Sequence, residues 1–248
     1  GTPDACTEAA TALDQIHVAA RLGTTPKQLR DHATELLATQ CAAGAADACF
    51  EHGKLAVRGA DPAQGMTEIE HACDAGSGRG CLFLAQHESH AARAAVYLDK
   101  ACDHGNAHGC ELLAEKDHKR APELHRKACD GDDALGCTRS GEVRRSSGDR
   151  TGAFADFSKA CDLHDLASCD AAGLLAPDPA TARELHGRAC DADIASGCSH
   201  LAELVAHGDG GDRDWGKGLD LAQRACTLAN AKVCPQLATL RKHPPEVH

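Results

Sequence analysis

The 248-residue sequence is acidic and rich in cysteine, with 15 Cys and a formal net charge of −11. This charge argues against nucleic-acid binding and against docking on anionic membranes, because both need basic surfaces. No apolar run approaches the roughly 18 residues that cross a bilayer, and aromatic residues make up only 2% of the chain, so a core must rest on Ala, Leu and covalent cross-links.

The first 40 residues lack the cysteine spacing of the rest of the chain but read as helical. The motif T-P-K-Q at residues 25–28 is typical of a capping box with proline at the first helical position. We expect residues 1–40 to form a helical cap over the open end of a repeat stack. The chain starts with G-T-P-D and shows no leader, so we interpret it as a mature chain whose export signal has been removed.

From residue 41 onward the cysteines follow a repeat. Fourteen of the 15 cysteines form pairs with seven intervening residues, and the first cysteines of successive pairs are 27 to 36 residues apart. The pairs are Cys41 and Cys49, Cys73 and Cys81, Cys102 and Cys110, Cys129 and Cys137, Cys161 and Cys169, Cys190 and Cys198, and Cys226 and Cys234. A period in this range indicates a repeat architecture.

The segments between the pairs read as helices. Residues 91–101 and 180–189 are strong helix formers with apolar residues three and four positions apart, and Pro, Gly and Asp clusters separate such segments. Each repeat is therefore predicted to hold two short helices, one starting just before a second cysteine and one ending at the next first cysteine. No stretch alternates like a strand. We expect an all-α, right-handed α/α superhelical solenoid of about fifteen helices, with a seven-junction repeat array at residues 41–241 and a flexible tail at 242–248.

Small residues recur at two fixed positions. Every repeat has Gly or Ala four residues after the second cysteine, which predicts that a neighbouring helix backbone approaches closely there. Gly44, Gly76 and Gly105 stand three residues after a first cysteine, where a helix end favours a left-handed residue.

The repeat unit at residues 101–114, A-C-D-x-G-x-A-x-G-C-x-x-L-A, resembles the SEL-one-like repeats (SLR). More narrowly, it is similar to the Hcp-like, TPR-related cysteine-rich proteins of bacterial periplasms and culture media. The resemblance covers roughly residues 41 to 240, although several repeats are short and tyrosine is nearly absent.

The paired cysteines favour disulfides over metal ligation. Their spacing places one cysteine at the end of a helix and the other early in the next helix, and a short turn can bring such positions to bonding distance. Structural zinc sites favour cysteines two to four apart, and a redox-active pair is usually C-x-x-C, which is absent. We therefore expect seven disulfides and a periplasmic or secreted location. Cys6 has no partner in this spacing and is assigned as a free thiol, with an intermolecular link or a partner in a removed segment as the alternatives.

The favoured function is a scaffold that binds a protein or peptide on the concave face of the solenoid, an expectation based on architecture alone. The helices that carry the second cysteines should line this face. Side chains expected to be exposed on them are Glu51, Lys54, Gln86 and Glu115. No cofactor is expected.

Two alternatives remain. Resemblance to the Hcp-like proteins implies a weak β-lactamase-like, penicillin-binding or penicillin-hydrolysing activity, although the S-x-x-K, S-D-N and K-T-G motifs are missing. The 16 histidines suggest a metal or haem binder instead, with His87 and His90, and His104 and His108, as candidate ligands on shared helix faces. His125 and His186, which each stand four residues before a first cysteine, belong to the same candidates.

Overall fold

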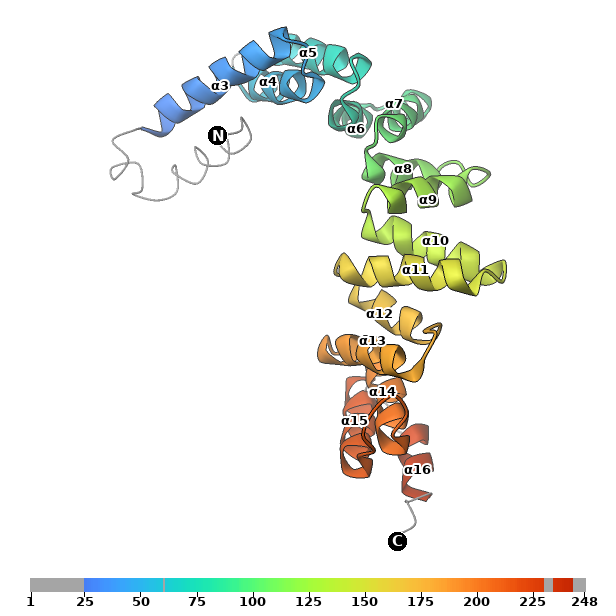
Figure 1. The fold of residues 1–248 in the computed structure, drawn as a ribbon. Coiled ribbons are helices and arrows are strands. Elements are labelled where there is room, and N and C mark those ends of the chain that lie inside the picture. The colour runs from blue at the N-terminus through green and yellow to red at the C-terminus, as the bar shows by residue number, and fades with distance from the viewer. Residues whose placement is uncertain (1–24, 60, 230–233, 243–248) are drawn as a thin grey trace. The chain divides into compact units, whose positions relative to one another are not determined.

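The computed structural model describes residues 25–59, 61–229 and 234–242, and in these residues the chain forms fourteen α-helices and no strands (Figure 1). The helices are α3 (Pro26–Ala42), α4 (Ala46–Arg58), α5 (Pro62–Asp74), α6 (Gly78–His87), α7 (Ala91–Asp103), α8 (Ala107–Ala114), α9 (Ala121–Asp130), α10 (Ala134–Ser146), α11 (Arg150–Asp162), α12 (Leu166–Gly173), α13 (Pro179–Asp191), α14 (Ala195–His207), α15 (Trp215–Leu228) and α16 (Pro235–Lys242). Each helix packs mainly on its neighbours in the chain.

All seven cysteine pairs are joined as disulfides. Six of them join the last turn of one helix to the first turn of the next, and the seventh joins the last turn of α15 to Cys234, directly before α16. They link α3 to α4, α5 to α6, α7 to α8, α9 to α10, α11 to α12, α13 to α14, and α15 to α16. The Cα atoms of the pairs lie 4.2 to 5.7 Å apart. The prediction of an all-α solenoid of disulfide-stapled helical hairpins is confirmed.

The chain divides into two compact units, with the division between Lys116 and Asp117. Helices α3 to α8 belong to the first unit and α9 to α16 to the second. Every disulfide lies within one unit, so each unit has its own set of cross-links.

Both predicted ends of the repeat array, residues 41 and 241, lie within helices. Cys41 lies in the last turn of α3, so the boundary predicted after residue 40 falls inside that helix, and Lys242 is the last residue of α16. Residues 1–24 of the predicted cap, including Cys6, and residues 243–248 of the predicted tail lie outside the described residues.

Helix starts are fixed by polar side chains that the sequence places just before them. Thr25 forms the predicted capping box with Gln28. Asp61, Asp149 and Asp178 accept a hydrogen bond from a backbone N–H in the first turn of the helix that follows each of them. The residues predicted to interrupt helices therefore also start the next ones.

In six of the seven repeats the residue three positions after the first cysteine adopts a left-handed conformation, whereas in the last repeat Ala229 has a φ of −73°. The prediction is confirmed for Gly44, Gly76 and Gly105, with φ of 91°, 105° and 79°. In three repeats of the second unit the same position is taken by residues with side chains, and their φ values of 61° to 71° carry a steric cost that glycine avoids. These residues are Asp132, His164 and Asp193.

His164→Gly should therefore raise the free energy of unfolding by about 0.5–1 kcal/mol. His164 suits this test because Asp132 and Asp193 form ion pairs that a glycine would remove. Urea unfolding measures the effect. The matched control is Ala43→Gly, where φ is −81° and added backbone freedom should lower stability. If both His164→Gly and Ala43→Gly lower the free energy of unfolding, the positive φ of His164 carries no steric cost.

The buried core consists largely of alanine, leucine and disulfide cysteines, with Ile69 and Phe157 among its largest fully buried side chains. These two side chains come four residues before a first cysteine, and each packs against the small residue of the preceding helix. A methyl group on Gly53 would lie 2.9 Å from the Gly65 carbonyl oxygen and from Ile69, and one on Gly141 would lie 2.9 Å from the Phe157 ring. The predicted close backbone approach thus occurs at Gly53, whereas at Gly141 a ring fills the space.

Ion pairs join successive helices that carry first cysteines. Lys100 of α7 pairs with Asp74 of α5 at 2.7 Å, and Arg188 of α13 pairs with Asp162 of α11 at 2.9 Å. In both pairs the Asp directly follows a first cysteine, whereas Asp130 at the same position of another repeat pairs with Arg126 of its own helix. All of these side chains are more than a third exposed, so each pair contributes little to stability.

Candidate functional site

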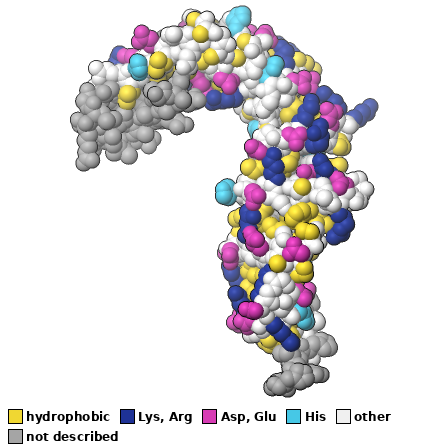
Figure 2. All heavy atoms as spheres, in the orientation of Figure 1, with side chains coloured by type: hydrophobic (Ala, Val, Ile, Leu, Met, Phe, Trp, Pro, Cys, Tyr) yellow, Lys and Arg dark blue, Asp and Glu magenta, His cyan; other side chains and the backbone are white. Residues whose placement is uncertain are grey.

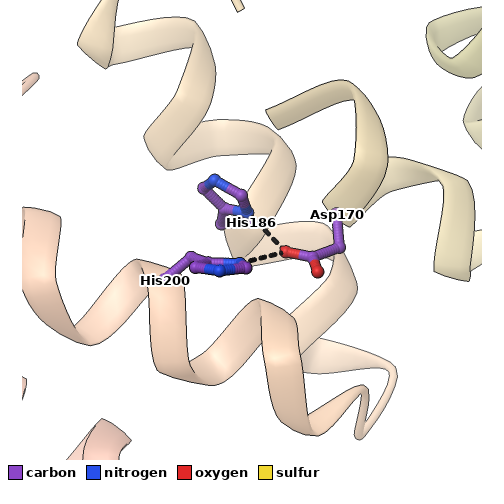
Figure 3. A group of neighbouring side chains, drawn as sticks. All are labelled: Asp170, His186 and His200. Carbon is purple, nitrogen blue, oxygen red and sulfur yellow. Dashed lines mark hydrogen bonds and ion pairs between the residues drawn. The ribbon is translucent and has the colours of Figure 1, made fainter. Parts of the chain in front are cut away.

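Three polar side chains from three helices of the second unit converge on one point. Asp170 of α12 accepts hydrogen bonds at its Oδ1 atom from Nδ1 of His186 at 2.7 Å and from Nδ1 of His200 at 2.8 Å (Figure 3). His186 lies on α13 and His200 on α14, and their ring centroids are 4.9 Å apart. We call these three residues the Asp–His–His cluster.

Disulfides fix the three helices close to the cluster. Asp170 directly follows Cys169, His186 precedes Cys190 by four residues, and His200 follows Cys198 by two. The disulfide between Cys190 and Cys198 clamps α13 against α14, so the two histidines have little freedom to separate. The cluster is thus held by the same cross-links that build the repeat.

His186 takes a position that other repeats fill with an apolar side chain. The residue four positions before the first cysteine is Ile69, Leu98 or Phe157 in three other repeats, and all three are buried. The His186 side chain is 4% exposed, and a methyl group on Gly173 would lie 2.6 Å from its ring. A hydrophobic residue would therefore fill the space at position 186, and it would avoid the free-energy cost of burying a polar ring.

The electrostatics of the cluster follow from the shared carboxylate. Burial by itself would raise the pKa of Asp170, but hydrogen bonds from His186, His200 and Ser196 outweigh it and lower that pKa well below its ordinary range. The hydrogen bond to Asp170 raises the pKa of His200, against the opposing effect of burial. Asp170 is therefore a carboxylate at neutral pH, aimed at two imidazole nitrogens.

The cluster has the composition of a metal-binding site. One donor atom from each residue lies within 4.8 Å of the other two, and in the described part of the chain no other group of three His, Cys, Asp or Glu residues meets this condition. Two imidazoles and one carboxylate are a common ligand set for divalent transition metals.

The histidines selected from spacing are not brought together in this way, and the expectation that each pair shares one helix face is wrong. His87 is the last residue of α6, whereas His90 is the N-cap of α7; His104 is the C-cap of α7, whereas His108 belongs to α8. The helix ends between the two members of each pair. Nδ1 of His87 contacts the Phe83 carbonyl oxygen at 2.8 Å.

The predicted contact side chains have mixed positions. Gln86 and Glu115 are exposed and Lys54 is half-buried, but Glu51 is buried, so its expected exposure is wrong. Glu51 is buried because two cations surround its carboxylate: Nζ of Lys54 lies 2.6 Å away and Arg79 of α6 forms a second ion pair. Both cations also lie over the Phe50 ring.

Glu51 and Arg79 border a pocket in the first unit, which we call the α4–α6 pocket. Its volume is about 180 Å³. The residues that line it are Leu37, Gln40, Ala45, Asp47, Ala48, Glu51 and Arg79. Helices α4 and α6, which carry second cysteines, contact each other beside it. The side chain of Arg79 is 46% exposed at the rim.

Sequence reasoning singled out neither Asp170 nor His200. His186 did carry a signal, because a histidine occupies a position that is apolar in three other repeats. The same signal at His125 does not lead to a comparable site: in α9 the neighbouring Leu124 takes the buried position and His125 is half-buried.

Comparisons with known proteins identify the fold. No family model matches the chain. Two solved structures superimpose on it, each with a TM-score of 0.57 and 16% identity. One is a protective antigen of uropathogenic Escherichia coli that displays an SLR fold (99% of this chain, 58% of the other), and the second is a Sel1 repeat protein from Oxalobacter formigenes (78% and 65%). The chain therefore has an SLR-like repeat fold.

Two curated relatives match part of the sequence. Cytochrome c oxidase assembly factor 7A of Xenopus laevis is 29% identical over 107 residues, and assembly factor 7 of Xenopus tropicalis is 27% identical over the same length. Each match covers 38% of this chain and 46% of the relative, so the chain spans about half the length of these relatives. Within the described residues, none of the helices combines the length and the apolar character needed to cross a bilayer.

Proposed function

We propose that this SLR-like repeat protein is a non-catalytic scaffold that binds a protein or peptide partner through the helices that carry its second cysteines, in the periplasm or outside the cell. Seven disulfides point to an oxidising environment outside the cytoplasm. Repeat folds of this kind present extended surfaces of neighbouring helices to protein partners.

The α4–α6 pocket is the observation that carries the proposal. Its volume of about 180 Å³ lies below the roughly 300 Å³ at which drug-sized ligands begin to fit, so it suits a single side chain of a larger partner. Leu37, Ala45 and Ala48 supply apolar walls, whereas Gln40 and Arg79 supply hydrogen-bond donors beside them. An apolar side chain flanked by peptide carbonyl groups fits this combination.

The pocket is also rigid. The disulfides Cys41–Cys49 and Cys73–Cys81 fix the starts of α4 and α6, and Ser77 donates a hydrogen bond of 2.5 Å to Asp47 between these helices. A surface that needs no ordering on binding loses less free energy when it takes up a peptide. On the face drawn in Figure 2, acidic and basic side chains are interspersed, so shape and local hydrogen bonds are the better basis for recognition.

Peptide selection tests the proposal. Peptides selected from a random display library against the whole chain should bind Arg79→Ala at least about tenfold more weakly than the unchanged protein. The matched control is Lys100→Ala, because Lys100 is 43% exposed and also pairs with a carboxylate, but lies on a helix that carries a first cysteine. Fluorescence polarisation of the labelled peptide gives the affinities. Selected peptides that bind both variants as well as the unchanged protein would contradict this role for the pocket.

A further inference from the structure

We propose that the Asp–His–His cluster is a binding site for one divalent transition-metal ion such as Zn²⁺, held by Asp170, His186 and His200. The site lies in the second unit and is independent of the peptide-binding role proposed for α4 and α6. Its support comes from geometry, burial and the comparison between repeats.

The geometry is close to that of a coordination sphere. Zinc bonds to imidazole nitrogen and carboxylate oxygen are about 2.0–2.2 Å long, so neighbouring ligand atoms around one tetrahedral ion stand about 3.3–3.6 Å apart. The Asp170 Oδ1 atom lies 2.7 Å and 2.8 Å from the two Nδ1 atoms. To hold an ion in place of the two shared protons, the carboxylate oxygen and each of the two nitrogens must therefore move apart by about 0.5–0.9 Å, through a shift of the carboxylate and a turn of the rings.

The donor atoms have the character that such an ion requires. Imidazole and carboxylate groups bind zinc and its neighbours in the transition series, whereas calcium and magnesium prefer all-oxygen sites. Asp170 brings a negative charge, which offsets part of the double positive charge of such an ion. A divalent ion would thus be favoured at this carboxylate.

Access and rigidity also fit an ion site. His186 and Asp170 side chains are 4% and 10% exposed, but the His200 side chain is 31% exposed, so the cluster is open to solvent on the His200 side. Three protein ligands and an open side leave room for water or another ligand as the fourth, as in zinc sites that keep one position exchangeable. Helices α12, α13 and α14 are each anchored by a disulfide near its ligand.

A purely structural role explains the cluster less well. Stability alone would favour an apolar residue at position 186, like Leu98 and Phe157 at the corresponding positions, because burying a polar group and a charge costs free energy. The pair formed by His52 and Glu68 in the first unit provides the contrast. His52 Nδ1 lies 2.7 Å from Glu68 Oε2, yet in the described residues no third His, Cys, Asp or Glu side chain joins them in a group that could hold a metal ion.

Titration calorimetry with Zn²⁺ on chelator-stripped protein tests the site. The unchanged protein should bind one Zn²⁺ tightly, and Asp170→Asn and His200→Gln should weaken this binding by at least about tenfold. His186→Leu should abolish it without unfolding the chain, because Leu98 already fills the equivalent position. Circular dichroism verifies that each variant is folded.

The control variant is His52→Gln, which removes a paired histidine outside the cluster and should leave Zn²⁺ affinity unchanged. Co²⁺ serves as a second probe, and its visible absorption bands should appear with the unchanged protein and disappear with His186→Leu. Zn²⁺ binding that persists in all three cluster variants, or that His52→Gln weakens equally, would overturn the proposal by placing the ion at other histidines. No tight binding to the unchanged protein would overturn it as well.

Discussion

Reduction of the seven disulfides should lower the melting temperature by roughly 20 °C or more, or abolish cooperative melting. Each bond closes a loop with a sequence separation of eight residues, and such a closure contributes about 2–3 kcal/mol on the chain-entropy model. Seven contributions of this size are comparable to the entire net stability of a typical domain, about 5–15 kcal/mol. The ring-poor core has few large side chains to compensate for their loss.

Differential scanning calorimetry with and without a phosphine reductant measures this effect, and a thiol count gives its control. Denatured but unreduced protein should expose one reactive thiol, at Cys6, and reduced protein should expose all 15. Cys6→Ala should remove the single thiol without changing the melting temperature. If the melting temperature is unchanged in protein whose 15 cysteines are all reduced, packing alone maintains the repeats.

The regular part of this fold was predictable because it depends on local sequence. Cysteine spacing gave the hairpins, and Gly44 and Gly76 marked the turns because glycine reaches positive φ without strain. The signal fails where a residue with a side chain takes the same backbone conformation. His164 has a φ of 71° in the turn between α11 and α12, although its residue type favours positive φ far less than glycine does.

The Asp–His–His cluster could not be predicted because its members meet across helices. Asp170 stands 16 residues before His186 and 30 residues before His200, distances that follow from the repeat length and not from one helix face. The pairs sought in the sequence were three or four residues apart, and a helix ends between the members of each. The sequence did mark His186 and His125 as polar residues at a position that is otherwise apolar, four residues before a first cysteine, but it gave no sign of which one has partners on other helices.

Glu51 illustrates a different source of error. A charged residue on a predicted surface helix is ordinarily exposed, since burial of an unpaired charge is costly. Here Lys54 comes from the same helix, but Arg79 comes from α6 in the next repeat, so the second ion pair is visible only after the helices are packed. Exposure of a charged side chain therefore depends on ion pairs between repeats, which the sequence of a single repeat does not reveal.

Phe157→Ala should lower the free energy of unfolding by about 3–5 kcal/mol, the largest loss expected for a single side chain. Phe157 is 2% exposed and packs in one cluster with Ala153 and Leu185, and the Arg145 guanidinium lies 5.6 Å from its ring centroid. Its removal leaves a cavity between α10 and α11 that short alanine side chains cannot fill. Chemical unfolding followed by circular dichroism measures the loss.

Two further variants distinguish this cavity from a general loss of aromatic character. Phe154 lies on the same helix but is only partly buried, so Phe154→Ala should cost at most about 2 kcal/mol. Gly141→Ala alone should destabilise, because its methyl group would lie 2.9 Å from the Phe157 ring. In the Phe157→Ala background that methyl group instead enters the cavity, so the double variant should be at least as stable as Phe157→Ala. If the stability losses of Gly141→Ala and Phe157→Ala simply add in the double variant, position 141 and the Phe157 ring are not in energetically important contact.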